Sequence, residues 1–484
     1  MEDKGKQLQD NPLSLATKIA YWGGQIAEGM KSTMFGLFLL FYYNQVLGLS
    51  GVLCGIALMI ATAVDAVTDP LMGSVSDGWR SRWGRRHPFM YGAAVPMAIA
   101  IYFTFDPMVD SQAGLFVWLL IFSILSRLTM TLYSVPHLAL GAEMTNDYQE
   151  RTVLVAGRSV CSYFGVLLVY AFGFGVFFAS SEAFENGQLN RAAYPPFALL
   201  MVVLMVVSIM GSALGTHHLI PSLLTPQKPD NNALKQVVLD TLEALKNISF
   251  RWLVIGFVVI SAPVGVGSAL ALYMNTFFWE IPPDQMIYIL AVSPIGTVIG
   301  YMFAPALGRY LEKRQSLILG ALGWVVFAVA PVSLHYVGLF PAPGTIGVVI
   351  GLAFCAFMSG LLVSQVGVAV GSMLGDVADE QELSNNKRQE GVFYGAYAFV
   401  IKATAGIGGA ISGFVLDLIS WPKGDDVQTA ADIPADILFQ LAMVAGPALA
   451  IGFLPAIWCF MHYRLDRGEH QSIVRELEAR RAAN

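Results

Sequence analysis

Long apolar segments recur along the whole chain and constrain its fold more than any other feature. Each is roughly 20 residues or longer, which an α-helix needs to cross the hydrocarbon core of a bilayer. Of the 484 residues, 56% are hydrophobic and only 13% are charged, whereas soluble chains carry about 25% charged residues. We therefore predict an all-α membrane protein. Its twelve expected transmembrane helices lie at about 19–45, 51–78, 88–106, 113–141, 153–178, 194–216, 252–279, 285–308, 315–337, 344–374, 389–419 and 435–462.

A polar connection divides these segments into six and six. Apolar residues at 234, 237, 238, 241, 242 and 245 recur there at helical spacing, which predicts an amphipathic helix on the membrane surface. A basic cluster follows the second span of each half, so the halves form a weak internal repeat. The expected divisions are an N-terminal six-helix bundle over 1–216, a cytoplasmic linker over 217–250, a C-terminal six-helix bundle over 251–463 and a cytoplasmic tail over 464–484.

The distribution of basic residues predicts the orientation. With both termini in the cytoplasm, about 22 of the 28 lysines and arginines fall on the cytoplasmic side. The polar first 17 residues lack the pattern of a cleaved signal peptide. The basic residues are spread over short loops, which argues against binding of nucleic acid. The four cysteines lie far apart in apolar segments and are expected to be buried small hydrophobes, so no cofactor or metal cluster is expected from them.

Two carboxylates lie on one face of the second span. Asp65 and Asp69 are four residues apart in an apolar helix, so they lie one above the other. An ionised carboxylate in hydrocarbon costs at least about 2.5–3.5 kcal/mol, so the pair needs a partner. A structural ion pair is one interpretation. The other is a cation site: oxygen ligands, with Thr68 between them, suit Na⁺, and paired carboxylates can also share a proton.

Other ionisable residues within the spans are candidates for function as well. Lys402, in the eleventh span, either pairs permanently with Asp65 or Asp69 or links a cation site to a substrate site. Arg158 is either an interface residue or a donor that holds sugar hydroxyls or a carboxylate. Glu28 and Lys31 are spaced to pair with each other, and a structural ion pair is the preferred interpretation of Arg127.

Charged residues at the ends of the spans predict a latch between the two halves. The basic loop after the second span is either a membrane anchor or the basic half of this latch, with the acidic half supplied after the tenth span. The candidate gating residues are Asp77, Arg85, Arg86, Asp376, Asp379 and Arg388.

Several motifs give the chain a family resemblance over nearly its whole length. They are Lys18-Ile-Ala-Tyr21, Phe41-Tyr-Tyr-Asn-Gln-Val-Leu-Gly-Leu, Asp65-Ala-Val-Thr-Asp-Pro-Leu-Met-Gly, Arg80-Ser-Arg-Trp-Gly-Arg-Arg-His-Pro-Phe, Ser134-Val-Pro-His, Glu150-Arg-Thr through Arg158, Asp376-Val-Ala-Asp379 and Arg388-Gln-Glu-Gly391 with Lys402. With them the chain resembles the glycoside-pentoside-hexuronide:cation symporters, the melibiose-permease branch of the major facilitator superfamily. The resemblance implies a major-facilitator fold of two six-helix bundles.

The resemblance also implies site residues. The implied cation ligands are Asp65, Asp69, Thr68 and Thr131, with Na⁺ as the metal ion that Asp65 and Asp69 could hold; melibiose transporters have Asn at the position of Thr68, so the coupling ion is Na⁺ or H⁺. Their acidic sugar ligands fall at Gly29 and Ser134 here, so galactoside specificity is not expected. The family's sugar site implies Arg158 and Lys402 here. Glu28 and Ser134, at or beside the positions of those acidic ligands, and Tyr163 and Tyr397, aromatic residues that could stack on a sugar ring, complete the candidate substrate residues.

Taken together, these features predict a symporter and not an enzyme. Inward movement of Na⁺ or H⁺ would drive uptake of a sugar or glycoside by alternating access, in a bacterial inner membrane and as a monomer, with membrane lipid and a small sugar as its partners. Two alternatives stay open at this point: a transporter of the same fold for a lysolipid or another amphiphile, and a sensor that binds a sugar without moving it.

Overall fold

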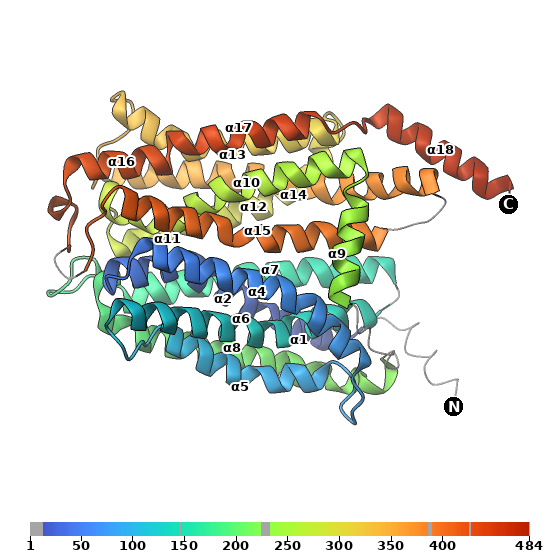
Figure 1. The fold of residues 1–484 in the computed structure, drawn as a ribbon, viewed down its shortest axis with the longest axis horizontal. Coiled ribbons are helices and arrows are strands. Elements are labelled where there is room, and N and C mark those ends of the chain that lie inside the picture. The colour runs from blue at the N-terminus through green and yellow to red at the C-terminus, as the bar shows by residue number, and fades with distance from the viewer. Residues whose placement is uncertain (1–12, 146, 224–232, 386–389, 425–426, 484) are drawn as a thin grey trace. The chain divides into compact units, whose positions relative to one another are not determined.

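The computed structural model describes residues 13–145, 147–223, 233–385, 390–424 and 427–483. These residues form helices and connecting segments, and no strand occurs among them (Figure 1). The chain packs as two compact units. The N-terminal unit comprises residues 1–234 with 422–428, and the C-terminal unit comprises 235–421 with 429–484.

The first apolar segment is a broken helix. It consists of α1 (Leu15–Gly23), α2 (Gln25–Thr33), a π turn (Met34–Phe38), α3 (Leu39–Phe41) and a second π turn (Tyr42–Val46). A Cβ at Gly24, where α1 meets α2, would overlap the Tyr133 hydroxyl, so a residue without a side chain is required there. The second π turn holds Tyr42 and Tyr43, whose hydroxyls donate to the Phe105 and Thr104 carbonyls at 3.2 and 2.8 Å.

Five further long helices complete the N-terminal unit. They are α4 (Gly51–Gly78), α5 (His87–Thr104), α6 (Gln112–Glu143), α7 (Tyr148–Phe172) and α8 (Tyr194–Thr216). Helices α4 and α5 pack on α6, α2 packs on α7, and α5 and α1 pack on α8.

The C-terminal unit repeats this packing. Its helices are α10 (Ile248–Tyr273), α11 (Pro283–Leu290), α12 (Val292–Leu307), α13 (Lys313–Tyr336), α14 (Ile346–Asn385), α15 (Glu390–Leu418), α16 (Ala435–Ala445) and α17 (Pro447–Met461). Helices α12 and α13 pack on α14, α10 packs on α15, and α13 and α10 pack on α17. Each main contact of the N-terminal unit therefore has a counterpart, as expected for two halves built on one plan.

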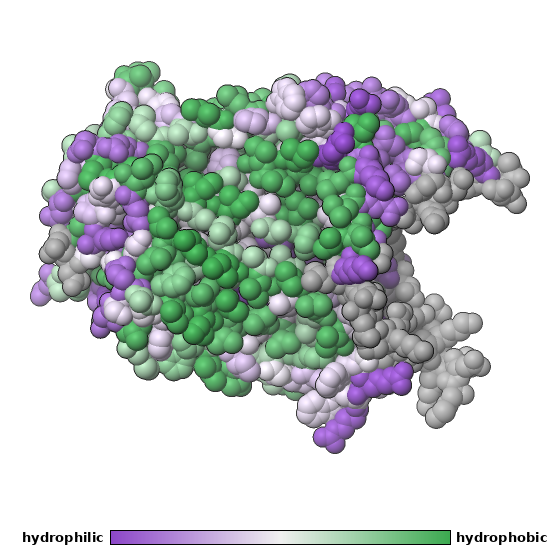
Figure 2. Space-filling model, in the orientation of Figure 1, coloured by the Kyte–Doolittle hydropathy of each residue, from purple (hydrophilic) through white to green (hydrophobic). Residues whose placement is uncertain are grey.

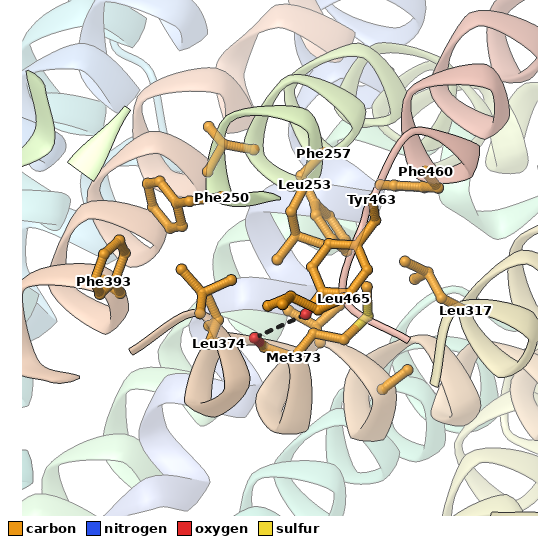
Figure 3. Packing of buried hydrophobic residues seen from close by; sticks show 14 of the residues in the cluster. Phe250, Leu253, Phe257, Leu317, Met373, Leu374, Phe393, Phe460, Tyr463 and Leu465 are labelled. Carbon is orange, nitrogen blue, oxygen red and sulfur yellow. Dashed lines mark hydrogen bonds between the residues drawn. The ribbon is translucent and has the colours of Figure 1, made fainter. Parts of the chain in front are cut away.

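Hydrophobic side chains cover the middle of the helices on the face drawn in Figure 2, and hydrophilic side chains gather toward the helix ends. Large apolar residues such as Val207, Phe303 and Ile451 are 61–70% exposed, which is normal for helices that face lipid. Inside the C-terminal unit, a cluster of aromatic and aliphatic side chains that includes Phe250, Met373 and Phe460 forms the core (Figure 3). The all-α membrane class is thereby confirmed.

Ten helices of the described residues are long and apolar enough to cross a membrane. The predicted spans 19–45 and 88–106 are not among them. The first is interrupted by the π turns, and α5 contains two prolines, two tyrosines and His87, which lower its hydropathy. The number twelve stays a prediction.

Two shorter helices lie outside the long ones. Helix α9 (Ala233–Ala244) occupies the predicted linker, with Val238, Leu239 and Leu242 exposed, an apolar edge that suits the membrane surface. Helix α18 (Arg467–Ala483) occupies the predicted tail and packs on α14. The predicted domain boundaries themselves stay predictions.

Candidate functional site

The two aspartates of α4 converge on one hydroxyl of α6. Thr131 Oγ1 lies 2.9 Å from Asp65 Oδ1 and 2.8 Å from Asp69 Oδ1. Thr131 is 3% exposed and Asp65 9% exposed. The i and i+4 spacing on α4 stacks the carboxylates, and the packing of α4 on α6 brings Thr131 to both of them.

A single hydroxyl cannot satisfy both carboxylates. The Thr131 side chain has one hydrogen to donate, so only one of the two short O···O contacts is a hydrogen bond from Thr131. In the other contact, two oxygen atoms approach each other without the Thr131 hydrogen between them. That contact is favourable only if the aspartate carries a proton or if a cation lies between the oxygens. Two carboxylate oxygens within hydrogen-bond distance of the same hydroxyl oxygen can therefore accept a proton or a small hard cation.

Arg127 is the cation that the described structure places beside Asp65. Its Nη1 lies 3.4 Å from Asp65 Oδ2, one turn before Thr131 on α6. The structural ion pair favoured for Arg127 from the sequence is thus present. Arg127 also interacts electrostatically with Glu28. The sequence-based hypothesis that Lys402 holds Asp65 or Asp69 involves α15, in the other unit, and stays a prediction.

Thr68 makes a local hydrogen bond. Its hydroxyl donates to the Asp65 carbonyl at 3.2 Å, a bond to its own helix that is common for threonine. The lone pairs of this oxygen can still accept or coordinate. Its assignment as a cation ligand stays a prediction.

Arg158 of α7 lies in an aromatic environment. Its guanidinium interacts electrostatically with the Tyr21 hydroxyl. The Tyr21 ring stacks on His137 at 4.6 Å, and His137 stacks on Tyr133 at 5.1 Å. His137 Nε2 donates to the Tyr21 carbonyl at 2.9 Å, which fixes the imidazole. Ser134, on α6, is half-buried. In the sequence analysis His137 belongs to the Ser134-Val-Pro-His motif but is given no role of its own.

Glu28 and Lys31 pair with each other, as their spacing predicts. Lys31 Nζ lies 3.4 Å from Glu28 Oε1. Gly29, between them, faces α7, where a Cβ would overlap the Ser162 carbonyl. Any side chain at residue 29, acidic or not, is therefore excluded by the α7 backbone, so the missing carboxylate is a packing requirement of this chain.

Gly29→Ala is expected to destabilise the protein because α2 and α7 must separate to admit the methyl group. Overpacking of this kind costs about 1–3 kcal/mol, and the obstacle here is backbone. Gly36→Ala is the matched control, since no atom lies within 4 Å of a Cβ there. Thermal unfolding of the purified proteins measures both, and equal midpoints would contradict this packing argument.

Tyr397, in the C-terminal unit, lines an apolar cavity of about 380 Å³ together with Phe257, Trp324 and Phe453. Its ring meets Phe257 edge-on at 5.3 Å. Lys402 follows five residues later on α15 and is exposed. Tyr163 lies on α7 and is half-buried. The substrate roles of these residues stay predictions.

The candidate gating residues form charge clusters inside each unit. Arg85 and Arg86 meet Glu143, with Arg85 Nη2 and Arg86 Nη2 at 2.8 and 2.7 Å from Glu143 Oε1. Asp77 pairs with Arg86. Glu143, the last residue of α6, was missed in the sequence analysis. The described contacts are all within the N-terminal unit.

The C-terminal unit has a corresponding cluster. Asp376 of α14 accepts two bonds of 2.7 Å from Lys313. His470 of α18 lies 3.3 Å from Asp376 and 3.0 Å from Asp379. Arg388 lies outside the described residues. A latch between the halves stays a prediction.

Known proteins share this fold over nearly the whole chain. The chain superposes on the inward open xylose transporter XylE from E. coli with a TM-score of 0.61 and 15% identity, over 95% of this chain and 98% of that one. This likeness confirms the fold of a major-facilitator transporter.

The family is shown by the sequence match. The model described as "MFS/sugar transport protein" matches residues 20–467. The chain belongs to this family and, within it, to the glycoside-pentoside-hexuronide:cation symporters. It is 24% identical to the inner membrane symporter YicJ of Escherichia coli, covering 97% of this chain and 96% of that one. It is equally similar to a glucuronide carrier protein homolog of the same organism, with the same coverage.

Proposed function

We propose that the protein is a secondary active symporter that couples inward Na⁺ or H⁺ movement to uptake of a sugar or glycoside. The observation that carries this proposal is the convergence of Asp65, Asp69 and Thr131 on one point inside an apolar helix pair. A charged oxygen cluster at membrane depth is costly unless a cation or proton is part of its working cycle.

Coupling follows from linkage between the two sites. A cation at Asp65 and Asp69 cancels negative charge and changes which groups Arg127 and Lys402 attract. If that rearrangement completes the sugar site, the cation raises the sugar affinity and the sugar raises the cation affinity by the same factor. Only the empty and the doubly loaded carrier then exchange between outward and inward states.

The substrate class we favour is a glycoside that carries an anionic group. Arg158 offers several hydrogen-bond donors beside Tyr21, and a guanidinium binds a carboxylate in two places at once. The α7 backbone leaves no room at Gly29 for an acidic sugar ligand, so the site is less acidic than in melibiose carriers. The relative named as a glucuronide carrier homolog supports this choice.

Thr131 provides a test that identifies the coupling ion. Thr131→Val keeps the shape of the side chain and removes the hydroxyl that contacts both aspartates. A hydrogen bond to a charged group contributes about 1.5–3 kcal/mol. The affinity for the coupling ion should therefore fall about tenfold or more. If Na⁺ is the coupling ion, the half-saturating Na⁺ concentration of uptake rises by this factor. If H⁺ is, the pH dependence of uptake shifts. Thr131→Ser retains the hydroxyl and should behave as wild type; an unchanged Thr131→Val would remove Thr131 from the ion site.

Uptake by reconstituted vesicles tests the function itself. Labelled neutral glycosides and glucuronides are offered under an inward Na⁺ gradient, an inward H⁺ gradient or neither. We expect accumulation of one sugar class above the outside concentration under one gradient. A sensor would give binding without counterflow, and a lysolipid carrier would respond to amphiphiles and to none of the sugars; either result would contradict the proposal.

The proposal extends to the oligomeric state, the membrane and the orientation of the protein. We infer a monomer in a bacterial inner membrane. Both termini are expected in the cytoplasm, because most lysines and arginines lie on the same side of the membrane as the termini. Uptake needs no cofactor besides the coupling ion.

A further inference from the structure

The C-terminal unit contains a second cavity, whose lining includes none of the candidate cation and substrate residues. It has a volume of about 520 Å³. Its walls come from the end of α12, the start of α13, the C-terminal half of α14 and the start of α18. Five basic side chains line it: Arg309, Lys313, Arg314, Arg467 and His470. Three acidic side chains also do, namely Glu312, Asp376 and Asp466.

Each of the three acidic side chains is already engaged. Asp376 accepts two bonds of 2.7 Å from Lys313 and lies 3.3 Å from His470. Glu312 caps the start of α13 in a capping box with Gln315. Asp466 caps α18 by accepting from the Glu469 amide at 2.8 Å. Counted at neutral pH with His470 neutral, the four lysine and arginine side chains of the lining exceed its three carboxylates by one positive charge.

The three arginines have only uncharged partners among the described residues. Arg314 Nη1 donates to the Tyr463 carbonyl at 3.3 Å, and Arg467 Nη2 donates to the Gly308 carbonyl at 3.0 Å. Carbonyls carry no net charge. Arg309 is exposed and, within the described part of the chain, has no side-chain partner. The cavity therefore presents three guanidinium groups that form no ion pair among the residues described.

The wall of the cavity is a stable part of the unit. Tyr463, just before α18, is 1% exposed and donates to the Met373 carbonyl at 3.3 Å, and Leu465 packs in the same cluster (Figure 3). Burial, with the nearby carboxylate of Asp376, raises the pKa of Tyr463, so its phenol remains a donor. Ile473 and Leu477 of α18 are also part of this core. Helix α18 is thus anchored, and Arg467 is held at the cavity.

We propose that this cavity binds a phosphate group, and that the group belongs to an anionic phospholipid. Phosphate oxygens match guanidinium donors in charge and geometry, and basic pockets between helices at the cytoplasmic end bind anionic headgroups. A lipid is favoured over a soluble phosphate because Tyr301 lines the cavity while the next residues of α12, Met302 and Phe303, are 76% and 61% exposed. The cavity thus adjoins a lipid-facing surface. Bound lipid would connect α12 and α13 to α18.

The test measures thermal stabilisation of the full-length protein in detergent by added phosphatidylglycerol, with phosphatidylcholine as the neutral lipid. A third arm adds inorganic phosphate against chloride at equal ionic strength. Variants are Arg309→Gln, which loses no described contact, and the double variant Arg309→Gln/Arg467→Gln. The matched control is Arg464→Gln/Arg475→Gln, which removes two exposed arginines that do not line the cavity.

We expect phosphatidylglycerol to stabilise wild type in a salt-sensitive manner. The double variant should need roughly tenfold more lipid for half-maximal effect, because it lacks two charge-assisted contacts. The control should match wild type. Equal loss in the control, or no difference between wild type and Arg309→Gln, would overturn the site. Stabilisation of wild type by inorganic phosphate as strongly as by the lipid would overturn the lipid as its source.

Discussion

Asp69→Asn is expected to abolish ion-driven accumulation of the substrate. The substitution removes one of the two charges that converge on Thr131, so the cation loses a ligand and the sugar gradient should fall to the level of simple equilibration. Counterflow of labelled sugar, which needs no ion gradient, should persist in part. Uptake and counterflow in the same vesicles measure both quantities.

Asp65→Asn should lose accumulation too, and also stability. Asp65 is the carboxylate beside Arg127, at 3.4 Å, and removing one partner of a buried pair leaves the other charge unpaired, at a cost of about 2 kcal/mol or more. Asp110→Asn is the matched control, since Asp110 is an exposed partner of Arg191. Full accumulation in both Asp65→Asn and Asp69→Asn would remove this pair from the coupling mechanism.

Glu143→Gln is expected to have the largest effect on stability. A single carboxylate oxygen of Glu143 lies 2.7–2.8 Å from both Arg85 and Arg86, and its side chain is 6% exposed. Neutralising it leaves two buried guanidinium groups with Asp77 as their remaining carboxylate partner among the residues that the structure describes. The expected loss is about 3–5 kcal/mol, measured as the free energy of unfolding in detergent.

The exposed Glu185 provides a matched control for this change. Glu185→Gln alters the same chemical group in a loop and should leave the unfolding free energy within about 0.5 kcal/mol of wild type. Glu143→Asp keeps the charge and should recover part of the loss. A Glu143→Gln protein as stable as wild type would show that the cluster does not hold α6 to the loop before α5.

The sequence predicted much of this fold because its signals are local. Apolar length identified the spans, and the four-residue spacing of Asp65 and Asp69 placed both on one face of α4. The second π turn of the first span was not predictable, since Tyr42 and Tyr43 in it contact backbone carbonyls of α5 and of the residue after it, which are distant in the sequence.

The contacts between helices were harder to predict. The position of Arg127 beside Asp65 depends on the rotation of α6 against α4, which no sequence spacing fixes. Glu143 was missed because a glutamate at the end of a span resembles an ordinary interface residue. The internal repeat held the missing signal: Asp376 in the C-terminal part of α14 pairs with Lys313 of α13, just as Glu143 at the end of α6 pairs with Arg86 beside α5.

The central claim, that ion and sugar sites are linked through Asp69, is tested most directly by sugar affinity measured with and without the coupling ion. Titration calorimetry on wild type should give tighter sugar binding when Na⁺ is added, or at lower pH if H⁺ is the ion. In Asp69→Asn the sugar affinity should no longer depend on either. The same ion dependence in wild type and Asp69→Asn would contradict the account.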